Sequence, residues 1–446
     1  MKNINFKENF YTDIRYENVK ESKIVYLDGE LQEMKEKQEK GAFIRVYDGT
    51  RWYYSSTTNL SRIQDEVNKL YSMGKEYKKI NEDENIKKLQ VNKAEYLKYN
   101  DALGKIPMEE KHNLLKEYLK VLKEAKYLKS FKVVYIDNRI VKRIVSSKGT
   151  DVTFDKESCG ISMRFTFSKG EKTFKDGFDL GKDSFESLKD GKEKLRKFLN
   201  KCEDFLINSK NVEQGKYTVI LSPQAAGVFA HESFGHKSEA DFMVGDETMI
   251  KEWSIGKQVG SPILSIVDSG EIVGSGYVPF DDEGTKAGEN YLIKNGKLFG
   301  RLHSSKTAVS LKEELTGNAR ALNFEYEPMV RMTNTYILPG KSTLEELISE
   351  VKDGFLIDTI KHGSGMSTFT IAPSISYRIK DGKIVEPVKI SVISGTVFET
   401  LKNVDGLSKE LQMLSFVTGG CGKMDQFPLP VGFGGPYVKV LNMNVQ

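Results

Sequence analysis

Two segments in the first half of the chain carry apolar residues at the three- and four-residue spacing of an amphipathic helix. The first runs from Met108 to Leu128 and the second from about Ser184 to Ile207. This spacing gathers apolar side chains on one face, which predicts two long helices that each pack against a core. The apolar faces are Leu114, Leu115, Tyr118, Leu119, Leu122 and Ala125 in the first, and Phe185, Leu188, Leu195, Phe198, Leu199, Cys202, Phe205 and Leu206 in the second.

Strand-like alternation flanks these helices. Phe43 to Tyr54 reads as two strands around Asp48-Gly49, a dipeptide suited to the positive φ angles of a tight hairpin. Phe131 to Phe167 alternates in the same way, with turn-like residues at Asp137-Asn138 and at Gly149. The pattern is typical of an antiparallel meander.

The second half of the chain is richer in glycine and carries fewer lysine-rich helical patterns. Asn295-Gly296 and Asp381-Gly382 each lie between alternating segments and predict two hairpins. A short helix is also expected, because Ser342 and Thr343 can cap its start and Gly354 can stop it. This half is therefore expected to be predominantly β.

The polar, turn-rich segment from Asn208 to Gly215 separates these two compositions, and we place a domain boundary there. The fold class that follows is α+β. An N-terminal mixed α/β domain (1–210) is followed by a β-rich C-terminal domain (211–446) built on an antiparallel sheet or barrel.

Composition narrows the class of protein. The chain has 446 residues, of which 39% are hydrophobic and 29% charged, so it is long enough for two cores and is not a disordered chain. No apolar segment is long enough to span a membrane and the start does not resemble a secretory signal, so we expect a cytoplasmic protein. The net charge of +4 is spread over alternating signs. The lysines from Lys111 to Lys132 alternate with glutamates, which indicates a solvated helix and not a nucleic-acid surface.

A candidate catalytic motif follows the expected strand from Tyr217 to Leu221. Ser222 is a good N-cap with Pro223 after it, so a helix should run from there into His231-Glu232-Ser233-Phe234-Gly235-His236. Two imidazoles can bind a divalent metal, while the glutamate between them accepts a proton from water. His231, Glu232 and His236 are therefore candidates for a hydrolytic metal site.

The spacing of the two histidines requires a distorted helix. Residues at i and i+5 lie about 140° apart around an ideal α-helix, whereas the usual zinc helix places its ligands at i and i+4, about 40° apart. A π-bulge or a break would return both rings to one side. We predict this distortion at Phe234 and Gly235, since glycine tolerates unusual dihedral angles.

A catalytic zinc site usually has three protein ligands and one open position, so a third ligand must come from elsewhere. The residues alone leave several candidates, namely Glu239, Asp241, His303, His362 and Cys421. Cys421 lies in a glycine-rich turn near Lys423, which favours a thiolate. The remaining cysteines and His112 are not expected to have a chemical role. Cys159 has no neighbouring residue that suggests one, Cys202 is a small apolar residue on the apolar face of a helix, and His112 lies on a lysine-rich helix.

Several longer motifs resemble the TldD/PmbA family of metalloproteases, once called modulators of DNA gyrase. They are GVFAHESFGHKSEADF, FDDEGTKAG, TGNAR with EPMVRMTNTYILPG, and GGCGK with PLPVGFGGP; the N-terminal DIRYE and FIRVYDGTRWYYSST are also similar. The intact H-E-x-x-x-H motif is similar to that of the active TldD-type subunit. One departure is Lys286, where the family commonly has proline, which affects the shape of that loop and not the metal site.

The resemblance implies one Zn²⁺ per chain, with His231, His236 and Cys421 as ligands and Glu232 as general base. It also implies hydrolysis of short or unfolded peptides, and pairing either as a homodimer or with a PmbA (TldE) type subunit. Its fold, an α/β domain followed by a β-rich domain, agrees with the division above. The alternative is a structural zinc in a scaffold subunit of a protease complex, where a fourth ligand such as Glu239 would close the site.

Overall fold

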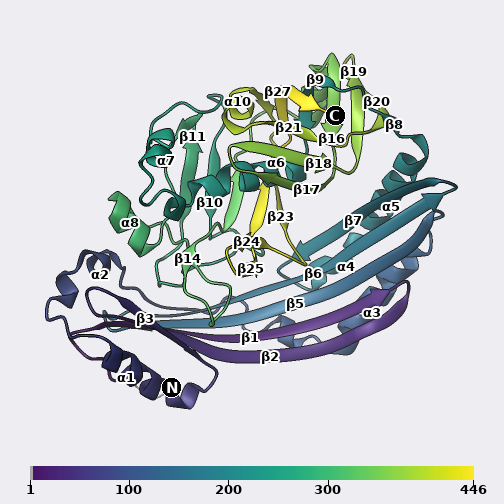
Figure 1. Ribbon diagram of the computed structural model, residues 1–446. Coiled ribbons are helices and arrows are strands. Elements are labelled where there is room, and N and C mark those ends of the chain that lie inside the picture. Colours follow the sequence, from purple (N-terminus) through teal and green to yellow (C-terminus); the bar gives the residue numbers. More distant parts are fainter. Residues whose placement is uncertain (1–3) are drawn as a thin grey trace.

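A long, curved sheet forms the N-terminal half of the computed structural model, which describes residues 4–446 (Figure 1). Its order is β3-β2-β1-β5-β6-β4, and β7 pairs with β6. All pairs are antiparallel except β4 with β6. The strands are β1 (Tyr11–Leu27), β2 (Glu30–Tyr47), β3 (Trp52–Thr57), β4 (Lys93–Tyr96), β5 (Leu128–Ser146), β6 (Asp151–Lys169) and β7 (Lys172–Lys182).

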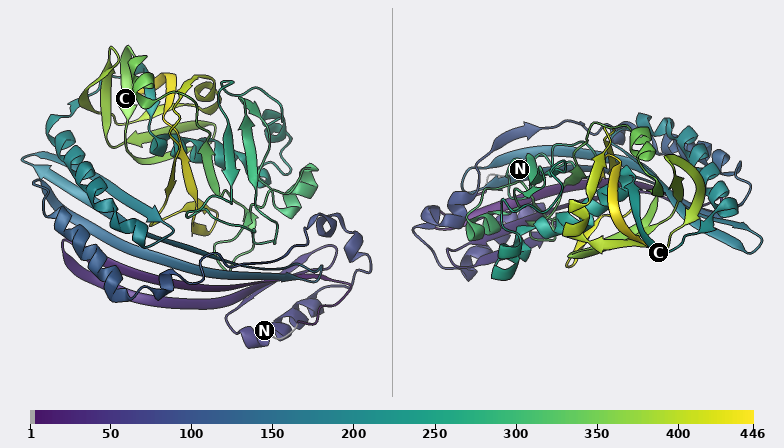
Figure 2. Two further views of the ribbon diagram at one scale, coloured as in Figure 1. Left: turned by 180° about the vertical axis from the view of Figure 1, so that it is seen from behind. Right: turned by 90° about the horizontal axis from the view of Figure 1, so that it is seen from above.

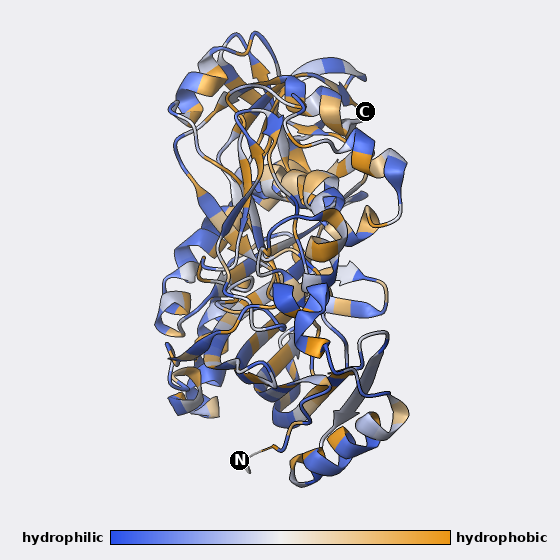
Figure 3. Cartoon of the chain, turned by 90° about the vertical axis from the view of Figure 1, so that its left-hand side faces the viewer, coloured by the Kyte–Doolittle hydropathy of each residue, from blue (hydrophilic) through white to orange (hydrophobic). Residues whose placement is uncertain are grey.

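Helices α3 (Met108–Leu122) and α5 (Gly191–Asn208) cover one face of this sheet, and they are the two dark blue and teal helices seen from behind in Figure 2. Their apolar stripes pack on alternate residues of the strands, such as Tyr135 and Met163, in one buried cluster. The intervening residues face the opposite side, where the C-terminal half lies. Hydrophilic and hydrophobic residues accordingly alternate along the strands (Figure 3).

Both helices were predicted, with two differences. The first helix ends at Leu122, before the expected Leu128, where β5 begins. The second is divided into α4 (Glu186–Lys189) and α5, with Asp190 between them. Smaller helical elements cover the far end of the sheet, namely η1 (Leu60–Arg62), α1 (Ile63–Met73), η2 (Ile80–Glu82), α2 (Glu84–Lys88) and η3 (Leu103–Lys105).

The strand predictions were right at the turns that contain glycine and wrong at one that does not. β2 and β3 form the expected hairpin, in which Gly49 has a φ of 90°, and Gly149 (φ 107°) lies between β5 and β6. Asp137-Asn138 is not a turn but lies inside β5. Asp137 is fully buried there, and the Nζ of Lys111 on α3 lies 2.8 Å from its Oδ2. A polar residue that suggested a turn therefore belongs to a buried ion pair.

The long hairpin of β1 and β2 was not predicted. The segment Glu30–Lys40 of β2 is exposed apart from the half-buried Glu33 and is rich in lysine and glutamate, so it shows no hydrophobic alternation. Within the described residues it pairs with β1 alone, since β3 reaches only as far as Ala42. It therefore forms a free edge of the sheet.

The C-terminal half contains two larger sheets around a second core. One has the order β12-β11-β10-β15-β26-β23, and the other the order β17-β18-β21-β27-β9-β16-β19-β20-β8, with β22 on β27. Most pairs are antiparallel, as predicted, but β9 with β16, β15 with β26, and β8 with β20 are parallel. The α+β fold class is thus confirmed.

The strands of this half are β8 (Lys210–Asn211), β9 (Gly215–Leu221), β10 (Ile266–Ser269), β11 (Glu289–Lys294), β12 (Lys297–Leu298), β13 (Ala319–Arg320), β14 (Met329–Val330), β15 (Asn334–Ile337), β16 (Asp353–Ile357), β17 (Ile360–Gly365), β18 (Thr368–Pro373), β19 (Ser376–Lys380), β20 (Lys383–Lys389), β21 (Ile393–Thr396), β22 (Val404–Leu407), β23 (Gln412–Ser415), β24 (Cys421–Lys423), β25 (Gln426–Leu429), β26 (Gly432–Gly435) and β27 (Val438–Val445). The helices are α6 (Pro223–Phe229), η4 (Ala230–Gly235), η5 (His236–Ser238), η6 (Ala240–Phe242), α7 (Glu247–Glu252), α8 (Ser305–Leu311), α9 (Leu344–Ser349) and α10 (Val397–Lys402).

The hairpin turns and the short helix predicted for this half from neighbouring residues are present in the structure. Asn295-Gly296 and Asp381-Gly382 both form hairpin turns with positive φ angles. α9 is the expected short helix, and Thr343 caps it in a reciprocal capping box with Glu346. It ends at Ser349, so Gly354 belongs to the next strand, β16.

Buried charges join the two halves of the chain. The loop that carries the acidic stretch FDDEG reaches the N-terminal sheet, where the Nζ of Lys142 donates a hydrogen bond to Asp282 (2.7 Å) and the Nη1 of Arg45 donates one to Glu283 (3.0 Å). All four side chains are buried. Buried ion pairs of this kind fix a relative orientation, because a displaced partner leaves an unpaired charge. Lys286, at the exposed end of this loop, does not take part in these pairs.

No helix among residues 4–446 is long and apolar enough to cross a membrane. The division at residue 210 coincides with the end of the N-terminal sheet and its helices, and as a statement about independent domains it stays a prediction.

Candidate functional site

The histidine motif lies where the helix after β9 changes its winding. The Ser222 side chain accepts a hydrogen bond from the backbone N–H of Ala225, and Pro223 occupies the first turn, as the sequence predicted. α6 then passes into a π-helix, η4, from Ala230 to Gly235. The wider turn of a π-helix returns residues i and i+5 to one side. The predicted distortion at Phe234 and Gly235 is confirmed. Gly235 itself has ordinary helical dihedral angles (φ −56°, ψ −53°), so the expected need for unusual angles was wrong; the position instead needs a residue without a side chain, because a Cβ there would lie 2.1 Å from the Sδ of Met332.

Cys421 reaches the same place from a short hairpin of β24 and β25. The guanidinium of Arg331, which is fully buried, donates hydrogen bonds to the backbone carbonyl oxygens of Cys421 (2.7 Å) and Gln426 (3.3 Å). The Nζ of Lys423 donates to the carbonyl oxygen of Val330 (2.9 Å) on β14. Two buried cations, Arg331 and the hairpin's own Lys423, thus fix the hairpin that carries the thiol.

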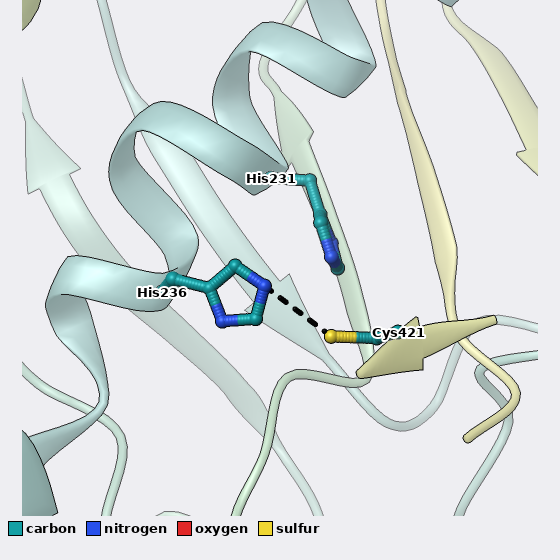
Figure 4. Close-up of side chains that lie close together, drawn as sticks. All are labelled: His231, His236 and Cys421. Carbon is teal, nitrogen blue, oxygen red and sulfur yellow. Dashed lines mark hydrogen bonds between the residues drawn. The ribbon is translucent and has the colours of Figure 1, made fainter. Parts of the chain in front are cut away.

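The structure brings His231, His236 and Cys421 together (Figure 4). One ring nitrogen from each histidine and the Sγ of Cys421 all lie within 4.8 Å of one another. The Nε2 of His236 is 3.4 Å from Sγ, and the two imidazole rings are 5.1 Å apart in an edge-on arrangement. Among residues 4–446, this is the single group of His, Cys, Asp and Glu side chains that meets the spacing of a three-ligand metal site.

The charges of these groups influence one another strongly. Burial alone would raise the pKa of the Cys421 thiol, but hydrogen bonding to His231 and His236 lowers it to about 5. Burial would lower the pKa of His236, but its hydrogen bonds to Cys421 and Glu239 raise it to about 10. Near neutral pH and without a metal, the pair is therefore a thiolate beside an imidazolium. A cation that displaces the imidazolium proton would find a thiolate ready to bind it.

Glu239 and Asp241 lie behind His236 and not among the three clustered groups. The Nδ1 of His236 is 3.3 Å from an oxygen of Glu239, which is fully buried. The Nζ of Lys423 donates to Glu239 (2.9 Å) and to Asp241 (2.7 Å). Burial opposes ionisation of Glu239, but its contacts with His236 and Lys423 lower its pKa overall. Glu239 therefore orients the His236 ring, as carboxylates commonly do for metal-binding histidines.

A cleft of about 770 Å³ opens beside the motif. One wall comes from β5, β6 and β7 of the N-terminal sheet and the other from α6, η4 and β17 of the C-terminal half. His231 and Glu232 both line it, and Glu232 is half-buried. The volume is sufficient for a short stretch of extended peptide.

The other candidate ligands lie outside the cluster. His303 is buried and bonds to Thr307 (3.1 Å) and Glu313 (2.9 Å), so it is a structural histidine. His362 is exposed on β17 and lines the cleft without joining the cluster. His112 is half-buried and contacts Tyr26 on β1. Cys159 and Cys202 are buried free thiols, and burial raises the pKa of both well above the ordinary value.

Arg331 was not singled out from the sequence, because it acts through backbone carbonyl oxygens that are remote in sequence. Lys423 was singled out as a cation near the Cys421 thiol, and the structure places its Nζ on Glu239, Asp241 and the carbonyl oxygen of Val330. Glu239 was considered as a ligand candidate, and its spacing of three residues from His236 was the one signal that it lies near that ring.

Family models match nearly all of the chain. The model described as the PmbA/TldA metallopeptidase C-terminal domain matches residues 214–446, domain 1 of the same family matches 12–74, and the central domain matches 101–202.

Full-length relatives carry consistent names. A metalloprotease of Methanothermobacter thermautotrophicus is 30% identical, with 98% of this chain and 95% of the relative covered. A metalloprotease of Methanocaldococcus jannaschii is 31% identical (97% and 96% covered), and the zinc metalloprotease TldD homolog of Saccharolobus solfataricus is 28% identical (98% and 96%).

Among solved structures, TldE from Thermococcus kodakarensis superposes with a TM-score of 0.79 at 16% identity, covering 98% of this chain and 96% of that one. At this identity the likeness concerns the fold, and it agrees with the curved sheet and the second, β-rich half described above. The family models and the full-length relatives go further than the fold, and they agree with the resemblance seen in the motifs: the chain belongs to the PmbA/TldD metallopeptidase family.

Proposed function

We propose that this protein is a zinc-dependent metallopeptidase that hydrolyses short or unfolded peptides, with His231, His236 and Cys421 as zinc ligands and Glu232 as general base. The observation that carries the proposal is the cluster of three ligand atoms within 4.8 Å, next to a cleft that Glu232 also lines. The names of the relatives support the class of enzyme.

The donor set fits zinc. Two imidazole nitrogens and a thiolate are ligands that zinc takes readily, and three protein ligands leave a fourth position open. The Nδ1 of His231 is buried and has no hydrogen-bond partner among the described residues, an arrangement that costs free energy unless something binds the ring. Ligand atoms of a tetrahedral zinc site lie roughly 3.5 Å apart, so a spread of 4.8 Å would close with shifts of about 1 Å.

Zinc, when bound, would supply a Lewis acid that polarises the peptide carbonyl and makes water more acidic. Glu232, adjacent to His231 and facing the cleft, would accept the proton from the attacking water and deliver it to the leaving amine. Glu239 would hold His236 in position through its Nδ1. A cleft of this volume has room for a short extended chain, which supports short or unfolded peptides as substrates.

The cleft also suggests how a peptide would be held. Edge strands of a β-rich half can bind an extended chain through backbone hydrogen bonds, and these bonds by themselves give little side-chain selectivity. As a partner we propose a PmbA (TldE) type subunit or a second copy of this chain. Membership of the PmbA/TldD family supports a partner of this kind.

The first experiment compares wild type with Glu232→Gln, both purified without chelator. We expect about one zinc per chain in both proteins, and cleavage of an unfolded peptide by the wild type alone. A Glu232→Gln variant with full turnover would refute the role of Glu232. If both proteins hold zinc and neither cleaves, even after a PmbA-type subunit is added, the metal is structural and the scaffold alternative holds.

A second variant tests the third ligand. Cys421→Ser replaces a thiolate with a hydroxyl, which is a much poorer zinc ligand, so zinc content should fall. Cys202→Ser is the matched control, because Cys202 is also a buried thiol but lies on α5, away from the motif. Full zinc content in Cys421→Ser would remove Cys421 from the site.

A further inference from the structure

The wall of the cleft that β5, β6 and β7 of the N-terminal sheet form is called the floor from here on. It carries basic side chains on neighbouring strands. Lys132 on β5 stands directly opposite Arg164 on β6, and Lys175 on β7 stands opposite Thr166 on β6. All four line the cleft, and they share the sheet face that is turned away from α3 and α5. Lys361 on β17 lines the opposite wall.

A lysine directly opposite an arginine is unfavourable unless an anion compensates one of them. Like charges directly opposite each other on antiparallel strands destabilise a sheet. Arg164 is compensated, because its Nη1 lies 3.0 Å from an oxygen of Asp179. Lys132 and Lys175 are exposed, and no ion pair or hydrogen bond joins either side chain to another residue of the described part of the chain.

The acidic residues of the cleft are engaged elsewhere. Asp179 is paired with Arg164. Asp176 accepts hydrogen bonds from the Oγ1 of Thr359 (3.2 Å) and from the backbone N–H of Gly177 (2.7 Å), and the charge of Lys361 acts on it as well. Glu232 belongs to the catalytic proposal. The uncompensated charge on the floor is therefore positive.

We propose that this basic floor binds a carboxylate of the peptide, so that the cleft selects acidic peptides or peptides with a free C-terminal carboxylate. The inference deepens the proposed peptidase function and rests on it, since it names the substrate class of the same cleft. Lys132 and Lys175 are specificity-determining residues in this view, whereas the chemistry belongs to the opposite wall. A carboxylate of the peptide would give Lys132 and Lys175 the anionic partner that neither has within the described part of the chain.

The test uses four peptides of one length and one neutral backbone sequence, all acetylated. The first contains two glutamates and has an amidated C-terminus; the second contains two glutamines and a free C-terminus; the third contains two glutamines and is amidated; the fourth contains two lysines and is amidated. Cleavage is measured with the zinc-loaded wild type. Binding is measured by calorimetry with Glu232→Gln, so that affinity is read without turnover.

We expect the first or the second peptide to bind more tightly than the third, and the fourth to bind most weakly. The first two peptides distinguish a side-chain carboxylate from the chain terminus. Lys132→Gln and Lys175→Gln should each reduce the preference up to about five-fold, the range of an exposed ion pair. Raising the salt from about 20 to about 500 mM should shrink it further. Lys40→Gln is the matched control, because Lys40 is exposed on β2 of the same sheet, outside the cleft.

Each outcome has a distinct meaning. Equal affinity and equal cleavage of all four peptides would overturn the inference and leave the peptidase proposal standing. A preference that survives in the Lys132→Gln/Lys175→Gln double variant would overturn it too. A carboxylate preference in binding, without cleavage by the wild type, would support the basic floor and contradict the peptidase proposal. Binding of none of the peptides would contradict both.

Discussion

Gly235→Ala tests whether the winding of η4 depends on the close approach between Gly235 and the side chain of Met332. A Cβ built at Gly235 would lie 2.1 Å from the Sδ of Met332, which is fully buried. Ordinary contacts between such atoms are about 3.5 to 4 Å, so Met332 or η4 would have to move by roughly 1.5 Å. His236 is the next residue, and we expect its ring to move with η4.

The size of the effect can be bounded from opposing contributions. Overpacking a buried site costs about 1 to 3 kcal/mol. Alanine is a better helix former than glycine by about 1 kcal/mol, which offsets part of this cost. We therefore expect the free energy of unfolding to fall by up to about 2 kcal/mol, together with a weaker affinity for zinc.

Urea denaturation of the metal-free protein, followed by tryptophan fluorescence, measures the first quantity. Trp253 reports on this region because its ring lies 4.9 Å from that of Phe234. Competition with a chromogenic chelator measures zinc affinity. Gly288→Ala is the control, since nothing lies within 4 Å of a Cβ at Gly288. Combining Gly235→Ala with Met332→Ala should destabilise less than the sum of the single changes, because the double variant has room for the new methyl group. Stability and zinc affinity equal to wild type in Gly235→Ala would refute the reasoning.

Three further predictions concern charged groups. Lys111→Met should lower the free energy of unfolding by about 3 kcal/mol in urea denaturation, because it leaves Asp137 charged and buried without its closest cation; a loss below about 0.5 kcal/mol would contradict this. Glu239→Gln should weaken zinc affinity roughly 10- to 100-fold in chelator competition, since the ring of His236 loses its charged partner; unchanged affinity would remove that role. Asp176→Asn should raise thermal stability at pH 8 but not below about pH 4. Burial raises the pKa of Asp176 to about 6, so the folded state binds a proton more tightly than the unfolded state, and stability falls as the pH rises from about 4 to 6. A benefit of asparagine that persists at low pH would contradict this assignment.

Features that depend on neighbouring residues were predictable. The positive φ angles at Gly49 and Gly296 and the cap at Ser222 each follow from the preferences of a few adjacent residues. The π-helix was also predictable, because the i and i+5 spacing of His231 and His236 could serve one site only if the helix were distorted.

Features that depend on partners remote in sequence were not predictable. His236 and Cys421 are 185 positions apart, so the residues alone left five candidates for the third ligand, and the family motif was needed to choose one. Asp137 was predicted to lie in a turn, because no residue close to it in the sequence indicates that Lys111 on α3 pairs with it. The outer half of β2 has no apolar alternation, because neither of its faces is covered.

That same outer half of β2 has a consequence for behaviour in a crowded solution. Backbone N–H and C=O groups along Glu30–Lys40 face outward within the described part of the chain, a template on which another extended chain could pair. Glutamates and lysines are closely spaced along this segment, such as Glu36, Lys37, Glu39 and Lys40. They make such pairing unfavourable unless the incoming strand carries opposite charges at the facing positions. If the cleft captures extended peptides, a charged outer edge keeps the same molecule from collecting them where no hydrolysis can occur.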